Sequence, residues 1–235
     1  MTGLASAPLG VELLDDPAAD PAVVRSSLGH IARSNRWLGG RAAMRSGLAL
    51  ALGSAGRGET LTLLDVGTGA GDLPLDAARW GRRRGFRIQP LGLDRSLTAA
   101  RLARESGVET VVGCAGTLPV RSRSVDVVLV SQVVHHLRQD AAIQLLRECE
   151  RIARRALIVT DLERARLAVA GFWVVSRVLQ FDAATRADGI TSVRRGYTHG
   201  EFRELFRLAG IGATTYRRPG YRLVAVAGRS IDADG

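Results

Sequence analysis

Residues 63–74 read LLDVGTGAGDLP, and they place three glycines directly after a short apolar run. The run over 61–66 does not alternate with polar residues, which is typical of a strand buried on both faces. Residues 73–84 have the pattern of a helix, and we expect Asp72 to cap its first turn. Glycine in such a connection permits left-handed backbone angles and lets a ligand approach the main chain. The stretch therefore predicts a ligand crevice between a strand and a helix N-terminus.

An alternation of strand and helix continues along the chain. We expect strands at 61–66, 88–93, 109–112, 125–131 and 156–160, and helices at 73–84, 97–106 and 139–152. Two further strands, at 213–217 and 221–227, flank Pro219 and Gly220 and predict an antiparallel hairpin. The pattern indicates an α/β fold with a Rossmann-like, doubly wound and mostly parallel sheet of seven strands.

The N-terminal part lacks this alternation. Residues 1–58 are expected to form a helical cap, with helices at 21–34 and 41–52, ahead of a main domain over 59–235.

The second departure from the alternation follows the fifth strand. Residues 164–197 are expected to form a helical lid insertion, with an apolar helix over 164–181 and a polar loop over 182–195. Thr198 and Glu201 then have the spacing of a capping box at the start of another helix. Five lid residues are expected to form an apolar lid over the acceptor: Phe172, Trp173, Val174, Leu179 and Phe181. Packing on the sheet is the alternative, and because the helix is apolar on many faces, a buried wall or a lipid-facing surface also stays open.

The bulk composition limits the class of protein. With 235 residues and a hydrophobic fraction of 46%, the chain can bury the core of one α/β domain. We expect no membrane-spanning helix, because no charge-free stretch reaches about 20 residues, and no signal peptide. Cys114 and Cys149 do not suggest a disulfide framework, so a reducing cytoplasm is expected.

The formal net charge is +10, and every basic side chain other than histidine is arginine. A compositional bias of the whole proteome explains this balance, and the arginines do not form one block. We therefore expect no nucleic-acid partner on charge alone, although an RNA substrate stays open as an alternative.

Asp94 provides a second signal for a nucleoside. It ends the apolar segment PLGLD, at the tip of the second expected strand, where an acid can accept both ribose hydroxyls. It can also cap the helix that starts near Ser96. The glycine spacing departs from the dinucleotide fingerprint, because position 72 is Asp. A nicotinamide-dependent dehydrogenase is therefore the weaker interpretation.

The residues that follow decide between cofactors. Residues 113–137 read GCAGTLPVRSRSVDVVLVSQVVHHL. With this stretch, the chain resembles the class I S-adenosylmethionine-dependent methyltransferases, in their small-molecule branch of methyltransferase type 11. The resemblance runs over residues 61–160, and it implies that S-adenosyl-L-methionine is the cofactor. No metal ligand set is expected.

The resemblance implies roles for individual residues. Gly67 and Gly69 would lie against the methionine part of the cofactor, Asp65 would order that loop, and Asp94 would bind the ribose. Other implied cofactor-binding positions are Thr68, Gly71, Arg95 and Ser131.

The resemblance also implies a contact to the adenine ring and a contact to the methionine carboxylate. Ala115 would offer its backbone N–H to the adenine ring, but Cys114 stands where the family usually has an acid for the adenine amino group. A thiol is a weak acceptor, so that contact is lost or moves to a carbonyl. Arg33 or Arg36 would pair with the methionine carboxylate.

His135 and His136 follow the fourth strand, beside the expected position of the transferred methyl group. A hydroxyl acceptor needs its proton removed near the transition state, and a histidine suits that task at neutral pH. We favour His136 over His135 as the general base, oriented by Asp161 at the end of the fifth strand. The alternative is that the two histidines only pack against the cofactor.

The sequence thus predicts methyl transfer to a small and fairly apolar acceptor. The expected acceptor is a phenolic or polyketide hydroxyl of a natural product, or a quinone-type ring carbon. An RNA or protein methyltransferase and a non-catalytic cofactor-binding module remain alternatives. The residues after the fourth strand, Ser131 to Val134, lack the Asn/Asp-Pro-Pro-aromatic motif usual in N-methylating members. The apolar insertion also allows a homodimer.

Overall fold

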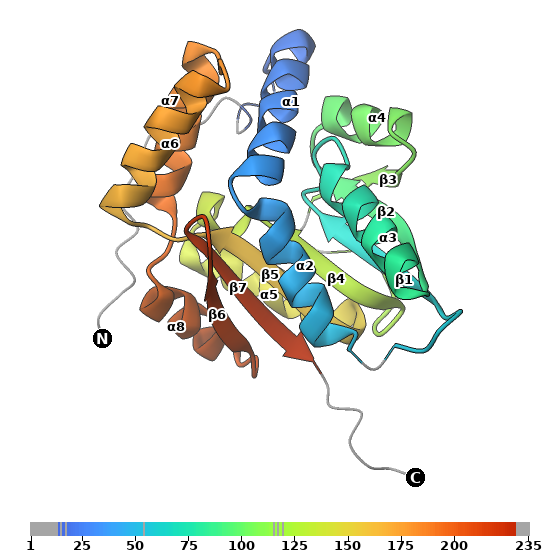
Figure 1. The fold of residues 1–235 in the computed structure, drawn as a ribbon. Helices are drawn as coiled ribbons and strands as arrows, with labels where there is room; N and C mark the ends of the chain where they lie inside the picture. The colour runs from blue at the N-terminus through green and yellow to red at the C-terminus, as the bar shows by residue number, and fades with distance from the viewer. Residues whose placement is uncertain are drawn as a thin grey trace.

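The structure is a computed structural model, and it describes residues 14, 16, 18–53, 55–114, 116, 118 and 120–228. Within these residues, seven strands form one sheet in the order β3-β2-β1-β4-β5-β7-β6 (Figure 1). The strands are β1 (Thr60–Val66), β2 (Arg87–Asp94), β3 (Glu109–Val112), β4 (Val125–Ser131), β5 (Ala153–Leu162), β6 (Thr214–Arg218) and β7 (Arg222–Gly228).

Strands β1 to β5 run parallel, and β7 lies antiparallel between β5 and β6. The order reverses direction at β1, where β2 lies on one side and β4 on the other. This doubly wound sheet and its C-terminal hairpin confirm the predicted fold class. In an open sheet of this kind, ligands bind outside the carboxyl ends of the strands at the reversal point.

Helices cover both faces of the sheet (Figure 1). They are α1 (Pro21–Trp37), α2 (Gly40–Ala51), α3 (Asp72–Arg84), α4 (Leu97–Glu105), α5 (Gln139–Ile152), α6 (Arg166–Val178), α7 (Ala183–Arg195) and α8 (His199–Ala209), and the 3₁₀ turn η2 (Val134–His136) follows β4. Helices α5 and α8 pack on one face around Phe202 and Leu145, and α2 and α3 pack on the other around Leu48 and Trp80. In Figure 1, α1, α6 and α7 stand side by side above the carboxyl edge.

Helix α2 approaches the sheet closely. A Cβ added at Gly47 would lie 2.6 Å from Cγ2 of Ile158 on β5, so no larger residue fits there without a shift. Met44 and Leu48 of the same helix are fully buried against β1 and β5. The second helix of the expected N-terminal cap therefore contributes to the core of the sheet.

Two local expectations were wrong. Asp72 is the first residue of α3 and not its cap, because Gly71 takes the cap position with φ of 80°. Residues 183–195, expected as a loop, form helix α7, whose cap is Asp182 with Oδ1 accepting from the Thr185 N–H at 2.8 Å. The loop was expected because α7 carries few apolar residues, so its helical periodicity is weak. Among the described residues, no helix is long and apolar enough to cross a membrane.

Candidate active site

The glycine turn after β1 has the left-handed geometry that its composition predicts. Gly67, Gly69 and Gly71 have φ values of 77°, 56° and 80°. A Cβ at Gly67 would lie 2.5 Å from Cγ2 of Val133, and one at Gly71 would lie 2.8 Å from Cγ2 of Val108. Glycine is therefore required at both ends of the turn, for backbone conformation and for space.

Asp94 ties this turn to the next helix. Its Oδ2 accepts from the Gly69 N–H at 2.8 Å, and its Oδ1 accepts from the Ser96 N–H at 2.9 Å. Ser96 itself caps α4, accepting from the Ala99 N–H. Each carboxylate oxygen of Asp94 keeps a second lone pair, so the binding of ribose hydroxyls is compatible with both contacts. Burial raises the pKa of Asp94.

Three carboxylates surround the glycine turn. Burial raises the pKa of Asp65 to about 8, and the nearby Asp72 and Asp94 add to the shift. Burial also raises the pKa of Asp72, against the opposing effects of Asn35 and Arg41. Oδ1 of Asp65 and Oγ1 of Thr68 are buried without a hydrogen-bond partner in the described part of the chain. The open glycine turn, the acids and these unsatisfied oxygens fit a cationic ligand such as S-adenosylmethionine.

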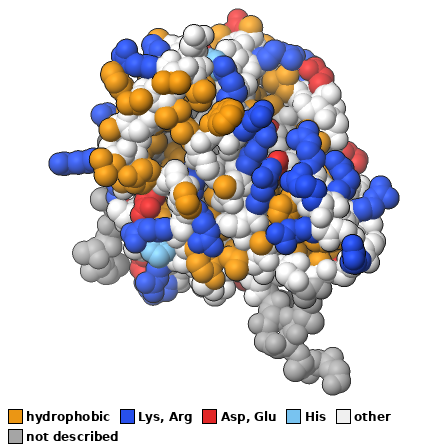
Figure 2. Space-filling view, viewed as in Figure 1, with side chains coloured by type: hydrophobic (Ala, Val, Ile, Leu, Met, Phe, Trp, Pro, Cys, Tyr) orange, Lys and Arg blue, Asp and Glu red, His pale blue; other side chains and the backbone are white. Residues whose placement is uncertain are grey.

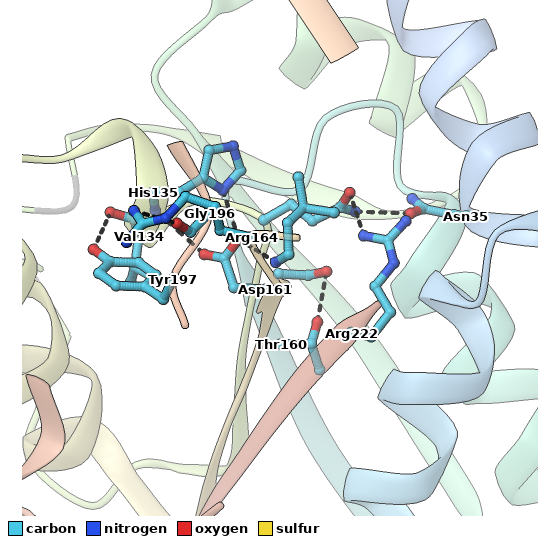
Figure 3. A network of polar contacts seen from close by, with 12 residues as sticks. Asn35, Val134, His135, Thr160, Asp161, Arg164, Gly196, Tyr197 and Arg222 are labelled. Carbon is cyan, nitrogen blue, oxygen red and sulfur yellow. Dashed lines mark hydrogen bonds and ion pairs between the residues drawn. The ribbon is translucent and has the colours of Figure 1, made fainter. Parts of the chain in front are cut away.

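The second centre is a buried histidine–aspartate pair. Nδ1 of His135 lies 2.6 Å from Oδ1 of Asp161, and both side chains are almost fully buried. Asp161 also accepts the backbone N–H groups of His135 and Leu162. In Figure 3, one nitrogen of the His135 ring faces the Asp161 carboxylate, and the other nitrogen points away from it. That nitrogen, Nε2, is buried without a hydrogen-bond partner among the described residues.

The pairing differs from the expected one. The sequence favoured His136 as the partner of Asp161, and the hydrogen bond is made by His135. The two residues follow each other in the 3₁₀ turn η2, with ring centroids 4.2 Å apart. His136 is the more exposed of the two.

Two contacts fasten the base of the lid next to η2. The Tyr197 hydroxyl donates to the backbone carbonyl of Val134 at 3.1 Å, and burial raises the pKa of that hydroxyl. Arg164 donates to the carbonyl of Gly196 and to the Glu201 carboxylate. Both ends of the insertion are therefore held beside the histidine pair (Figure 3).

A chain of buried and half-buried polar side chains runs from the glycine turn to β7 (Figure 3). Nδ2 of Asn35 faces the Asp72 carboxylate at 3.3 Å, and Oδ1 of Asn35 accepts from Nε2 of Gln132 at 2.7 Å. Oε1 of Gln132 in turn accepts from the Arg222 guanidinium at 2.7 Å. Burial lowers the pKa of Arg222 to about 10, and the nearby Asp161 opposes that shift. No motif in the sequence indicated that Gln132 or Arg222 belongs to the site.

Gln132 has an unusual backbone conformation for its residue type. Its φ is 55°, and its N–H donates to the carbonyl of Thr160 on β5. A left-handed conformation at a residue other than glycine is uncommon and is often found at functional sites. At this position it directs the chain from the end of β4 into η2.

The remaining predicted cofactor residues lie in different settings. Ser131 is buried at the end of β4, where its hydroxyl accepts from that of Thr160. Arg36 is exposed, with its guanidinium over the ring of Trp37. Arg95 and Cys114 are also exposed. Ala115 lies outside the described residues, so the expected adenine contact stays a prediction.

Arg41 on α2 is a further cation at the site, and no motif in the sequence indicated it. Its Nε is buried without a hydrogen-bond partner in the described part of the chain, and its Nη2 lies 3.9 Å from Asp72. It therefore faces the helix end of the glycine turn more directly than the exposed Arg36 does. No group of three or more His, Cys, Asp or Glu residues that could hold a metal ion occurs in the part of the chain that the structure describes.

Comparisons with known proteins agree with this geometry. Residues 64–158 match a family described as a methyltransferase domain. PigF with SAH has a TM-score of 0.63 to this chain at 18% identity, over 93% of this chain and 62% of that one. TnmH has a TM-score of 0.62 at 22% identity, with the same two shares. A SAM-dependent methyltransferase from Aquifex aeolicus has a TM-score of 0.58 at 18% identity, over 88% of this chain and 97% of that one. No curated protein sequence matches.

The sheet order, the glycine turn and the matched domain define an S-adenosylmethionine-dependent methyltransferase. Residues 64–158 match a methyltransferase domain, and S-adenosylmethionine is the cofactor of this enzyme.

Proposed function

We propose that this enzyme transfers the methyl group to a hydroxyl of a small, fairly apolar acceptor, of the phenolic or polyketide kind found among natural products. A quinone-type ring carbon is the related alternative, because its methylation also releases a proton. The observation that supports this proposal is the buried His135–Asp161 pair at the carboxyl end of β4 and β5. Such a pair can accept the proton that an acceptor hydroxyl loses.

The hydrogen bonds support a different role for each nitrogen of His135. Asp161 accepts two backbone N–H groups, and we infer that it accepts the Nδ1 proton of His135 as well. In the neutral ring, Nε2 then carries the lone pair. We therefore propose His135 as the base and Asp161 as the residue that orients it. This replaces His136, which the sequence favoured as the base.

The acids around the glycine turn would hold the cofactor. S-adenosylmethionine supplies a methyl group bonded to a positively charged sulfur. Asp65, Asp72 and Asp94 give this region negative charge when ionised, which favours a cation. Asp94 would receive the ribose hydroxyls, and Arg41 would receive the methionine carboxylate. These residues orient the cofactor, and alignment of the donor with the acceptor is the main demand of methyl transfer.

The lid gives the acceptor site an apolar side. Phe172 and Phe181 lie with ring centroids 6.3 Å apart, and the ring of His30 on α1 stacks on Phe181 at 4.9 Å. Helix α7 contacts η2, so the lid that carries Phe172 and Phe181 also contacts the turn of the histidine pair. An apolar ring system would bury surface against this side of the lid. We place the reaction in the cytoplasm, in keeping with two free cysteines.

Calorimetric titration with S-adenosylmethionine and S-adenosylhomocysteine tests the first half of the proposal. Saturable binding is expected, and binding weakened by Asp94→Asn would support the ribose contact. Methyl-labelled cofactor with a panel of phenols, catechols, hydroxyquinones and aromatic polyketides tests the second half. Label in a phenolic ether supports O-transfer, whereas label on a ring carbon supports the quinone-type alternative. Label found only in added tRNA or protein would overturn the small-molecule assignment.

A further inference from the structure

Helix α6 presents an apolar face outward. Leu167 and Val178 are 71% and 75% exposed, and Val174 between them is 52% exposed. With Gly171 they lie at spacings of three, four and seven residues, so they form one stripe along the helix. We call this set (Leu167, Gly171, Val174 and Val178) the α6 stripe.

The opposite face of α6 is already occupied. Ala168 and Ser176 are buried, and Phe172 packs against α7 so closely that a Cβ at Gly189 would lie 2.1 Å from the tip of its ring. The helix therefore has an inner face that packs within the lid and an apolar outer face for which the described residues supply no cover. Among these residues, no other helix exposes so many large apolar side chains.

Cations border the α6 stripe. Arg166 and Arg177 lie on one edge with Trp173, whose ring has the Arg177 guanidinium 4.1 Å from its centroid. Helix α6 contains no acidic residue, and residues 164–197 contain six arginines against two aspartates. Figure 2 shows hydrophobic side chains gathered over the lid helices, with blue side chains at their borders.

We propose that α6 docks on the surface of an anionic lipid bilayer, with the α6 stripe in the acyl boundary and Arg166 and Arg177 at the phosphates. An apolar face with arginines at its edge and a tryptophan beside them suits the membrane interface. Each arginine near an anionic surface adds attraction that falls with salt. The helix lies on the bilayer and does not cross it, in keeping with its 13 residues.

Charge argues for lipid over a second copy of this chain. An antiparallel two-fold contact between two α6 helices would bring the Arg166 and Arg177 borders of both copies together, and neither helix carries an acid to pair with them. A bilayer containing anionic lipids supplies the opposite charge along the whole border. The apolar stripe and its cations are therefore complementary to the same partner.

The position of α6 connects this surface to the site. Its inner face packs on α7, and α7 contacts η2, which carries His135 and His136. An acceptor dissolved in the bilayer would thus meet the lid before it meets bulk water. This part of the inference rests on the proposed apolar acceptor, whereas lipid docking does not depend on it.

Flotation of the full chain with vesicles tests the docking. We expect binding to vesicles of phosphatidylcholine with phosphatidylglycerol, weak binding to phosphatidylcholine alone, and release at high salt. Leu167→Glu with Val178→Glu should weaken binding by at least about tenfold, because two apolar contacts are lost and two negative charges face the lipid. Leu50→Glu with Leu97→Glu is the matched control, since it makes the same charge change at exposed leucines outside the lid.

The outcomes separate the alternatives. Equal binding by the stripe variant and the control would overturn the proposal, as would no binding of the parent chain to anionic vesicles. A dimer in sedimentation that the stripe variant dissociates, without vesicle binding, would assign the surface to a second copy instead. Arg166→Gln with Arg177→Gln should retain the apolar stripe but lose most of the salt dependence. Cofactor binding measured on each variant keeps this result distinct from a failure of the proposed methyl transfer.

Discussion

Oδ1 of Asn35 accepts a hydrogen bond from Nε2 of Gln132 at 2.7 Å, and this contact joins the N-terminal helix to the end of β4. The other side of the same amide faces Asp72 at the start of α3. Asn35 is only 2% exposed, so its polar atoms depend on these two partners. Helix α1 is thereby fixed to the glycine turn and to the turn that carries the histidines.

Asn35→Ala tests this connection. The variant leaves Gln132 and Asp72 with buried polar atoms unsatisfied, which destabilises by about 1–3 kcal/mol. A domain of this size changes its Tm by about 2–4 °C for each kcal/mol, so thermal unfolding should show a loss of several degrees. Ser34→Ala, one residue earlier in α1, is the control and should unfold near the parent temperature. Equal unfolding temperatures for Asn35→Ala and the parent would show that the contact contributes nothing.

His135→Gln and His136→Gln distinguish the two histidines. If His135 removes the proton, His135→Gln should slow methyl transfer to an accepted substrate by about 10²–10⁴-fold without weakening cofactor binding. His136→Gln should keep most of the activity, and Asp161→Asn should reduce it because the amide no longer fixes the ring nitrogen. Single-turnover rates over a range of pH measure this. A large loss in His136→Gln with none in His135→Gln would restore the order expected from sequence.

Asp65 should make stability depend on pH. Burial raises its pKa to about 8 in the folded chain, whereas an unfolded Asp has a pKa of about 3.9. The folded state thus binds the Asp65 proton more tightly than the unfolded state does. Binding of this proton stabilises the folded chain fully below about pH 4, and the stabilisation is lost as the pH rises to about 8. Asp65→Asn cannot ionise, so its Tm advantage over the parent should grow from about pH 5 to about pH 8.

The control for this measurement is Asp140→Asn, at an exposed carboxylate of α5. It should follow the parent curve across the same range. The cofactor should oppose the effect at Asp65, because a bound cation favours the ionised carboxylate. Asp65→Asn should therefore gain less stability from added S-adenosylmethionine than the parent does. Parallel curves for Asp65→Asn and the parent would contradict the raised pKa.

Local patterns in the sequence predicted the parts of this fold that have local causes. The glycine turn follows β1 and Asp94 ends β2, so their positions at the carboxyl edge could be inferred from strand ends alone. Helix α7 was missed because its few apolar residues give little periodicity, although Asp182 marks its start. The bonds from Gln132 to Asn35 and Arg222 join residues 97 and 90 positions apart, so no local pattern indicates them.

The sequence also could not indicate which of the two histidines pairs with Asp161, for a different reason. His135 and His136 are adjacent and of the same residue type, so composition and spacing treat them alike. The 3₁₀ turn η2 and the positive φ of Gln132 determine which ring meets Asp161. The Gln132 N–H donates to the carbonyl of Thr160 on β5, a tertiary contact that is visible only in the folded chain.

Gly189 and Gly171 provide a matched pair that tests the packing of the lid. Both lie inside helices of the lid, but a Cβ at Gly189 would lie 2.1 Å from the ring of Phe172, and one at Gly171 meets no heavy atom within 4 Å. Gly189→Ala should separate α6 from α7 and destabilise the lid by about 1–3 kcal/mol. Gly171→Ala should be neutral or stabilising by up to about 1 kcal/mol, because alanine favours the helix. Hydrogen exchange of the amides in α6 and α7 reports this locally, and faster exchange is expected in Gly189→Ala alone.

If the lid supplies the apolar side of the acceptor site, the same variant should also raise the KM for an apolar acceptor while the affinity for S-adenosylmethionine stays near that of the parent. Unchanged exchange in both variants would show that the Phe172 ring moves aside freely and that the contact with α7 does not hold the lid.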